Sequence, residues 1–154
     1  MTLSDTIAAI ERTAYRQPAV NMIVRNDIFR LNAAKAARYG AFGWLQREHS
    51  AAIDSSFLQF SFTFFYVDRL TPSKMNETEI QSVGVQTLDN IIRTLDAEGI
   101  IPSNVWTFTT FNQRFSDECA GVFTNVTFMV PVDGQCGVTF PDFSTDFNDD
   151  FLII

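Results

Sequence analysis

Residues 57–68, FLQFSFTFFYVD, carry the clearest structural signal in the sequence. Large apolar side chains occupy the even positions, while the odd positions include Gln59, Ser61 and Thr63. Successive side chains of a strand point to opposite faces, so this period of two predicts a strand with one aromatic core face and one polar face. One polar face is typical of a mainly antiparallel sheet. The core face consists of Leu58, Phe60, Phe62, Phe64 and Tyr66.

A short helix is predicted at the N-terminus. Thr2 and Asp5 have the spacing of a capping box, in which each residue bonds the backbone N–H of the other. Pro18 stops the helical pattern. The apolar face of this helix carries Leu3, Ile7 and Ile10.

A longer helix is predicted over about residues 77–98. Asn76 takes the N-cap position with Glu79 at N3, and Gly99 marks the end. A helix of about 22 residues is ~33 Å long, enough to lie across a whole sheet. Its core face recurs at helical spacing through Ile80, Gly84, Leu88, Ile91, Ile92 and Leu95.

The remaining strands are predicted from β-branched and aromatic segments bounded by turn residues. Residues 19–34 form two short strands joined by a turn at Asn26-Asp27, and residues 39–46 form a strand that contains two glycines. Residues 105–111 and 120–130 form an antiparallel pair that ends at Pro131.

These elements predict an α+β fold in which one long helix and a short N-terminal helix pack on a mainly antiparallel sheet. The chain of 154 residues has the length of one domain. We place that domain at residues 1–136 and treat residues 137–154 as a separate acidic, Phe-rich segment. The net charge of −7 argues against a free-standing nucleic-acid binder, because such domains usually carry a basic excess.

The charge is distributed unevenly along the chain. Residues 1–74 contain nine Lys or Arg and six Asp or Glu, a balance of +3, whereas residues 75–154 contain two Arg and twelve acids, a balance of −10. Within the first half, residues 12–47 are called here the basic region, which is compatible with a solvated face, a patch that meets an acidic neighbour, or a surface that faces DNA. Its cations are Arg12, Arg16, Arg25, Arg30, Lys35, Arg38 and Arg47.

Residues 137–154 combine four Asp with four Phe and no basic residue. An acidic segment is usually solvated, but burying an aromatic side chain gains ~1.5–3 kcal/mol, so these rings favour docking. Packing on the same chain, docking on another subunit and plain disorder all remain open. The rings in question are Phe140, Phe143, Phe147 and Phe151.

The motifs of common enzyme classes are missing from the sequence. His49 is the only histidine, which excludes a metal site built on a histidine pair, and no Cys-x-x-Cys, Walker or Gly-x-Ser-x-Gly pattern occurs. Cys119 and Cys136 are expected as free thiols, since no export signal precedes them. We therefore expect no enzymatic activity, no cofactor and no metal, and no membrane partner.

Several strings resemble small proteins encoded in the tail modules of tailed phages that infect gut Bacteroidota, the crAss-like phages among them. The resemblance covers about residues 20–136. It rests on Phe65-Tyr66-Val67-Asp68-Arg69-Leu70-Thr71, on Asn76 with Ile80-Gln81-Ser82, on residues 111–122 (FNQRFSDECAGV) and on Cys136, and more loosely on Tyr39-Gly40-Ala41-Phe42.

The resemblance implies a subunit similar to tail-terminator and neck-ring proteins, which assemble around the DNA channel between portal and tail. We therefore expect a non-enzymatic virion protein, assembled in the bacterial host cytoplasm, that forms a homo-oligomeric ring. Its partners would be itself, neighbouring connector or tail proteins, and DNA that passes without sequence-specific contacts. The alternative is a monomeric cytoplasmic accessory or binding domain. The expected subunit-interface residues are Arg25, Arg30, Lys35, Arg38, Phe140, Phe143, Phe147 and Phe151.

Overall fold

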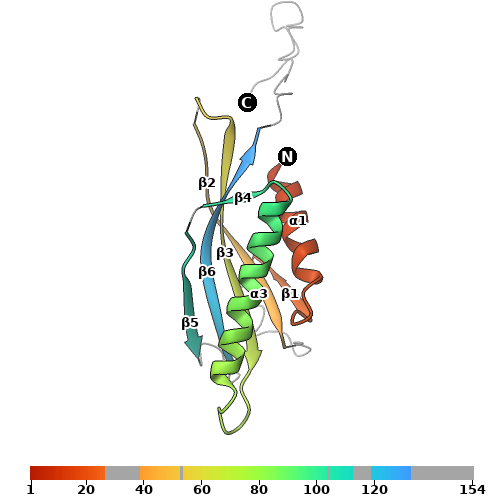
Figure 1. Cartoon of the computed structure of the whole chain (residues 1–154), viewed down its shortest axis with the longest axis vertical. Helices are drawn as coiled ribbons and strands as arrows, with labels where there is room; N and C mark the ends of the chain where they lie inside the picture. Colours follow the sequence, from red (N-terminus) through yellow and green to blue (C-terminus); the bar gives the residue numbers. More distant parts are fainter. Residues whose placement is uncertain (27–38, 53, 104, 113–118, 133–154) are drawn as a thin grey trace, which may run out of the picture.

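A computed structural model describes residues 1–26, 39–52, 54–103, 105–112 and 119–132. The described chain forms a mainly antiparallel sheet with both helices on one face, which confirms the α+β class (Figure 1). In chain order the elements are α1 (Leu3–Tyr15), β1 (Met22–Arg25), β2 (Ala41–Ala51), β3 (Phe57–Arg69), α3 (Glu77–Ala97), β4 (Ile101–Pro102), β5 (Phe108–Asn112) and β6 (Cys119–Pro131).

The sheet has the strand order β1-β2-β3-β6-β4, and β5 also pairs with β6. Only the pairing of β1 with β2 is parallel among the described strands. β4 and β5 bond the same edge of β6 at different heights, since Ile101 lies opposite Met129 and Phe108 lies opposite Thr124. The predicted antiparallel pairing of the last two strands and the end at Pro131 are thus confirmed.

The aromatic face of β3 forms the centre of the core, as predicted. Phe62 and Phe64 are fully buried, and their ring centroids lie 6.3 and 5.9 Å from the ring centroid of Phe128 on β6. The helices cover this face with Ile10 of α1 and Leu88 of α3 among the fully buried side chains.

The opposite face of β3 differs from the prediction. Gln59, Ser61 and Thr63 are at least partly exposed, but Phe65 and Val67 are buried in a second apolar cluster. The polar face predicted from the alternation therefore covers only the first half of the strand.

Both predicted helices are present. The capping box of α1 is confirmed, because the Asp5 backbone N–H donates to Thr2 Oγ1 and the Thr2 N–H donates to Asp5 Oδ2. α3 begins directly after Asn76, and all six residues of its predicted core face are buried. The Asn76 side chain does not cap the helix: its Oδ1 accepts from the Thr71 N–H at 2.9 Å and so holds the preceding turn.

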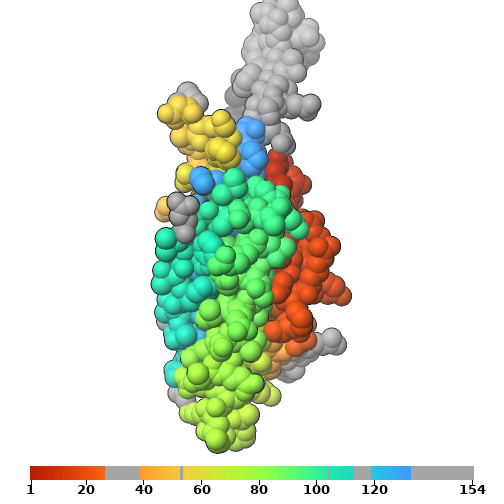
Figure 2. Space-filling view, viewed as in Figure 1, coloured from red at the N-terminus to blue at the C-terminus, as the bar shows by residue number. Residues whose placement is uncertain are grey.

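The two strands predicted over residues 19–34 are described only in part. Residues 22–25 form β1, which adds in parallel to β2, while the predicted second strand falls in residues 27–38, outside the described ranges. β2 begins at Ala41 and runs to Ala51 with an irregularity between Gln46 and His49. In the space-filling view the tip of the β2–β3 hairpin projects beyond both helices (Figure 2).

A polar cluster fixes the connection between β4 and β5 on α3. The Trp106 indole N–H donates to Asp89 Oδ1 at 3.2 Å, and Arg93 Nε donates to Asp89 Oδ2 at 2.6 Å. The Arg93 guanidinium also lies 5.7 Å from the Trp106 ring centroid. This cluster anchors the edge of the sheet to the helix.

Candidate interface on the open face of the sheet

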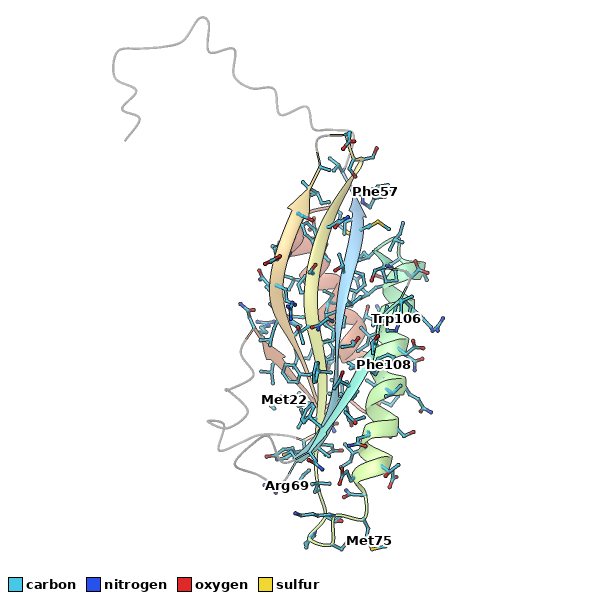
Figure 3. The ribbon with its side chains drawn as sticks, turned by 90° about the vertical axis from the view of Figure 1, so that its left-hand side faces the viewer. Met22, Phe57, Arg69, Met75, Trp106 and Phe108 are labelled. Carbon is cyan, nitrogen blue, oxygen red and sulfur yellow. The ribbon has the colours of Figure 1, made fainter. Side chains whose placement is uncertain are left out.

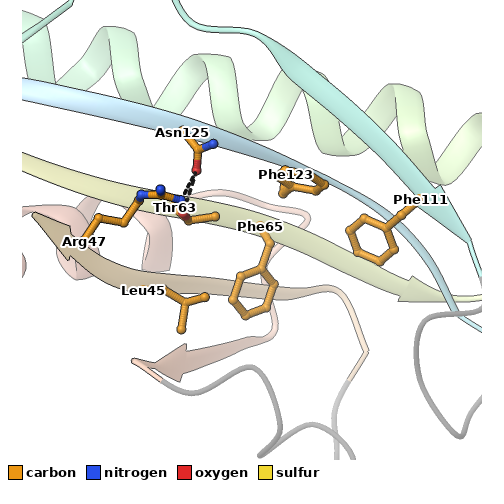
Figure 4. Close-up of a pocket in the computed structure, with 7 residues that line it drawn as sticks. All are labelled: Leu45, Arg47, Thr63, Phe65, Phe111, Phe123 and Asn125. Carbon is orange, nitrogen blue, oxygen red and sulfur yellow. Dashed lines mark hydrogen bonds between the residues drawn. The ribbon is translucent and has the colours of Figure 1, made fainter.

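The face of the sheet opposite the helices is called here the open face. Figure 3 shows it with α1 behind the strands and α3 beside them, and with β3 running from Phe57 at one end to Arg69 at the other. The open face contains a hollow of about 260 Å³, called here the open-face hollow (Figure 4). Seven side chains line it: Leu45, Arg47, Thr63, Phe65, Phe111, Phe123 and Asn125.

Two glycines allow aromatic rings to lie flat on this face. A Cβ atom on Gly43 would collide with Phe65 Cζ, so the Phe65 ring occupies the space of a missing side chain. A Cβ atom on Gly121 would collide with the Tyr66 backbone oxygen of β3 and would lie 2.8 Å from Phe111 Cζ. The ring centroids of Phe111 and Phe123 are 6.3 Å apart. This distance is within the usual range for aromatic pairs. The sequence thus builds an aromatic floor on the side of the sheet opposite α1 and α3.

The other end of the open-face hollow is polar. The Thr63 hydroxyl donates to Asn125 Oδ1 at 2.6 Å across the β3–β6 pair. Arg47 Nη1 lies 3.4 Å from Thr63 Oγ1 and 3.3 Å from Asn125 Oδ1, so both oxygens orient the guanidinium (Figure 4). The hollow therefore joins an aromatic floor to one positive charge.

Arg47 differs from other arginines of the basic region. Arg12 pairs with Glu98 at 2.7 Å, and Arg25 pairs with Glu11 at 2.7 Å. The bond from Glu11 raises the pKa of the Arg25 guanidinium above its ordinary value. Arg47 has only neutral hydrogen-bond partners within the described ranges. Part of the predicted basic region is thus neutralised by acids of the same chain.

Among the predicted interface residues, only Arg25 lies in the described part of the chain. Its side chain is 69% exposed, and the bidentate contact with Glu11 ties β1 to α1. A subunit contact at Arg25 stays a prediction. The other predicted interface residues, Arg30, Lys35, Arg38, Phe140, Phe143, Phe147 and Phe151, lie outside the described residues.

His49 and Cys119 lie at opposite ends of β3. His49 is paired with Phe60 and Cys119 with Arg69. At ~3.3 Å per residue, these two positions are separated by about 30 Å along the strand. His49 Nδ1 accepts from the Ser61 backbone N–H at 3.3 Å. His49 therefore cannot serve as a base for Cys119. Cys136 lies outside the described residues.

The prediction from sequence missed the open-face hollow, although residues 64–67 carried a signal for it. Phe64, Phe65, Tyr66 and Val67 form a continuous apolar run, which is typical of a strand covered on both faces. Recognising it required the partners of Phe65 on other strands, Gly43 of β2 and Phe123 of β6.

The residues that the structure describes contain no group of three or more His, Cys, Asp or Glu side chains able to hold a metal ion. None of the helices in these ranges is long and apolar enough to cross a membrane. No family model matches the chain, and no curated protein matches it either.

Proposed function

We propose that the protein is a non-enzymatic structural subunit that forms a homo-oligomeric ring in the connector or tail barrel of a tailed phage, similar to a tail terminator. The resemblance of residues 20–136 to tail-module proteins supports the identification of the particle. The composition of the open-face hollow supports the assembly.

The observation that carries the proposal is the set of side chains around the hollow. Three Phe, one Leu and one Arg line it together with two neutral polar residues, and among the described residues no Lys, Asp or Glu takes part. The centres of protein interfaces are enriched in aromatic residues and Arg and depleted of Lys, Asp and Glu. A face with this composition is suited to a protein partner.

A ring also requires two different patches on each subunit, because a closed head-to-tail assembly joins unlike surfaces. The surface formed by α1 and α3 and the open face are two such different patches. The uneven charge of the chain, with a balance of +3 in residues 1–74 and −10 in residues 75–154, supports head-to-tail attraction in the same way.

The proposal is tested by the size of the purified full-length protein and by its presence in particles. We expect mass photometry and sedimentation velocity to show one closed oligomer, electron microscopy to show rings, and mass spectrometry of gradient-purified virions to detect the protein. A protein that stays monomeric at all concentrations and is absent from virions would be the monomeric accessory domain instead, and the proposal would be wrong.

A matched pair of variants links assembly to the open face. Leu45→Lys places a charge at the rim of the hollow, whereas Val105→Lys places the same charge on an apolar side chain that is 78% exposed elsewhere. The Leu45 variant is expected to lower the oligomer fraction and the Val105 variant to leave it unchanged. If the two variants have the same oligomer fraction, the subunit interface does not include the open face.

A further inference from the structure

The open-face hollow has the size and lining of a site for aromatic side chains. Its volume is about 260 Å³. An apolar cavity of only ~150 Å³ takes up benzene. The rings of Phe65, Phe111 and Phe123 can contact an added ring in edge or offset geometry. An aromatic side chain from a partner would therefore fit between them.

A positive charge at the rim of the hollow favours an occupant that carries a negative charge. Arg47 is oriented by Thr63 and Asn125 and has no acidic partner within the part of the chain that the structure describes. A carboxylate beside the incoming ring would form a charge-assisted hydrogen bond with this guanidinium. The occupant that fits the hollow is thus a segment with an acid next to an aromatic residue.

The chain itself contains such a segment. The dipeptide Asp-Phe occurs at 142–143, 146–147 and 150–151, at a spacing of four residues, and nowhere else in the sequence. Residues 133–154 contain five Asp and no basic residue, so their charge complements Arg47. Each repeat offers the pair of side chains that the hollow requires.

The end of β6 lies away from the open-face hollow of the same subunit. The strand passes the hollow at Phe123 and Asn125 and continues away from it to Pro131. This last part of the strand is about 20 Å long. Residues 133–154 have a maximum reach of roughly 70 Å, and the first Asp-Phe lies within about 35 Å of Val132. Docking in the hollow of its own subunit would need the chain to reverse after Pro131, whereas docking in the hollow of a second copy would not.

We propose that an Asp-Phe pair from residues 142–151 of a neighbouring copy docks in the open-face hollow, with the ring among Phe65, Phe111 and Phe123 and the carboxylate on Arg47. This inference rests on the proposed homo-oligomer. The contact joins two unlike surfaces, as a head-to-tail ring requires.

The first test uses a labelled peptide of residues 137–154 and full-length protein whose own segment carries Phe143→Ala, Phe147→Ala and Phe151→Ala. Fluorescence anisotropy is expected to show binding. Arg47→Glu in the same protein should weaken it about tenfold, because an attractive surface pair becomes a repulsive one. Arg16→Glu is the matched control and should leave binding unchanged, and circular dichroism checks that each variant is folded.

A charge swap sharpens the peptide test. A peptide with Asp142→Lys, Asp146→Lys and Asp150→Lys should bind the Arg47→Glu protein better than the original peptide does. No binding of the original peptide, or equal binding to the Arg47→Glu and Arg16→Glu proteins, would overturn the inference.

The second test mixes two full-length variants, one with Arg47→Glu and one with the three Phe→Ala changes. Each alone should fail to form the closed oligomer. The mixture should form dimers that do not grow, because one intact segment meets one intact hollow. The inference would be overturned if these dimers are absent and residues 137–154 are protected from hydrogen exchange in each monomer that retains its Phe residues. That result would show that the segment docks on its own chain.

These outcomes separate the inference from the proposed function. If both variants form the same closed oligomer as the original protein, the ring proposal stands and the docking of residues 142–151 is wrong. If the original protein is monomeric and absent from virions, the ring proposal is wrong, and the docking of a neighbouring copy falls with it.

Discussion

Single residues decide whether the open face can be aromatic, and Gly43 is the clearest case. A methyl group at this position would collide with Phe65 Cζ, so the ring must move. We expect Gly43→Ala to destabilise the protein by about 1–3 kcal/mol, as overpacked sites do, measured by urea unfolding.

The same substitution in a Phe65→Ala background provides the control. The three atoms nearest to the added methyl group all belong to the Phe65 ring. Contacting residues show strong non-additivity. The cost of Gly43→Ala is therefore expected to fall below about 0.5 kcal/mol. Equal costs in both backgrounds would mean that Phe65 is not what Gly43 accommodates.

The two faces of β3 differ in how strongly they resist truncation. Phe62 is fully buried. Phe62→Ala is expected to cost about 3–5 kcal/mol in urea unfolding. Ser61 is half-buried, and its hydroxyl is bonded to Thr127 Oγ1 at 2.8 Å. Ser61→Ala should therefore cost only about 0.5–1.5 kcal/mol. Comparable losses for both changes would contradict the register of β3.

Tyr66 makes the stability of the folded protein depend on pH in the alkaline range. Burial of the ring, and secondarily the nearby Asp68, raise the pKa of the Tyr66 hydroxyl to about 12. The ordinary pKa of tyrosine is about 10, so the folded state holds its proton more tightly than the unfolded state. This contribution to stability is complete below pH ~10 and is lost as the pH rises toward ~12.

Tyr66→Phe removes this titration and is the matched comparison. The free energy of unfolding of the original protein should fall relative to that of Tyr66→Phe between about pH 9 and 12, while the difference stays constant between about pH 7 and 9. A constant difference over the whole range would show that the hydroxyl has the same pKa in both states.

At the scale of elements, one carboxylate of α1 adds polar bonds to two strands beside the apolar packing of the helix. Glu11 Oε1 accepts from Arg25 Nε at 2.7 Å and from the Trp44 indole N–H at 3.0 Å, and Oε2 accepts from Arg25 Nη2 at 2.8 Å. Glu11→Ala leaves a partly buried indole N–H without its acceptor, and we expect a loss of about 1–3 kcal/mol. Glu11→Gln keeps an acceptor and should lose less. Thermal unfolding of both variants checks this order, and the reverse order would contradict it.

The elements differ in how well the sequence predicts them, for a physical reason. The capping box of α1, the core face of α3 and the alternation of β3 are local patterns, set by neighbours a few residues apart. The parallel pairing of β1 with β2 depends on residues far apart in the chain, such as Met22 and Ala41. The open-face hollow is lined by residues of several strands, and the sequence pattern does not predict which strands become neighbours.

The Asn76 side chain shows that a contact can be missed even where the helix itself is predicted correctly. The position of the N-cap was predicted, but the side chain bonds the Thr71 backbone because the turn from β3 brings that N–H within reach. Local spacing predicts where a helix begins. The partner of a polar group depends on the chain that folds back beside it.

At the scale of the whole molecule, the charge asymmetry predicts how assembly responds to salt. Arg30 and Arg38 belong to the basic region, and the acids are concentrated in the second half of the chain. Exposed charges are screened beyond ~10 Å at about 0.1 M salt, so the rate of assembly is expected to fall as salt rises. Stopped-flow light scattering measures this rate.

Charge reversal gives the corresponding variant. Arg30→Glu with Arg38→Glu should slow assembly, and Arg30→Gln with Arg38→Gln should slow it less. If these arginines face the DNA channel instead, the Arg→Glu variant should form a normal ring and retain DNA less well. Rates that respond neither to salt nor to reversal would leave the asymmetry as plain solvated surface.

The position of β6 in the sheet also sets the order in which the protein can fold. Thr63 and its bonded partner Asn125 lie 62 residues apart, and β6 lies between β3 on one side and β4 and β5 on the other. A ribosome makes β6 after these three strands, so the nascent chain carries β3 with one edge unpaired until the rest of the described sheet has been synthesised. Contacts between distant segments slow folding, and unpaired aromatic strands aggregate. We therefore expect the chain to be prone to aggregation during its synthesis, until β6 pairs with β3.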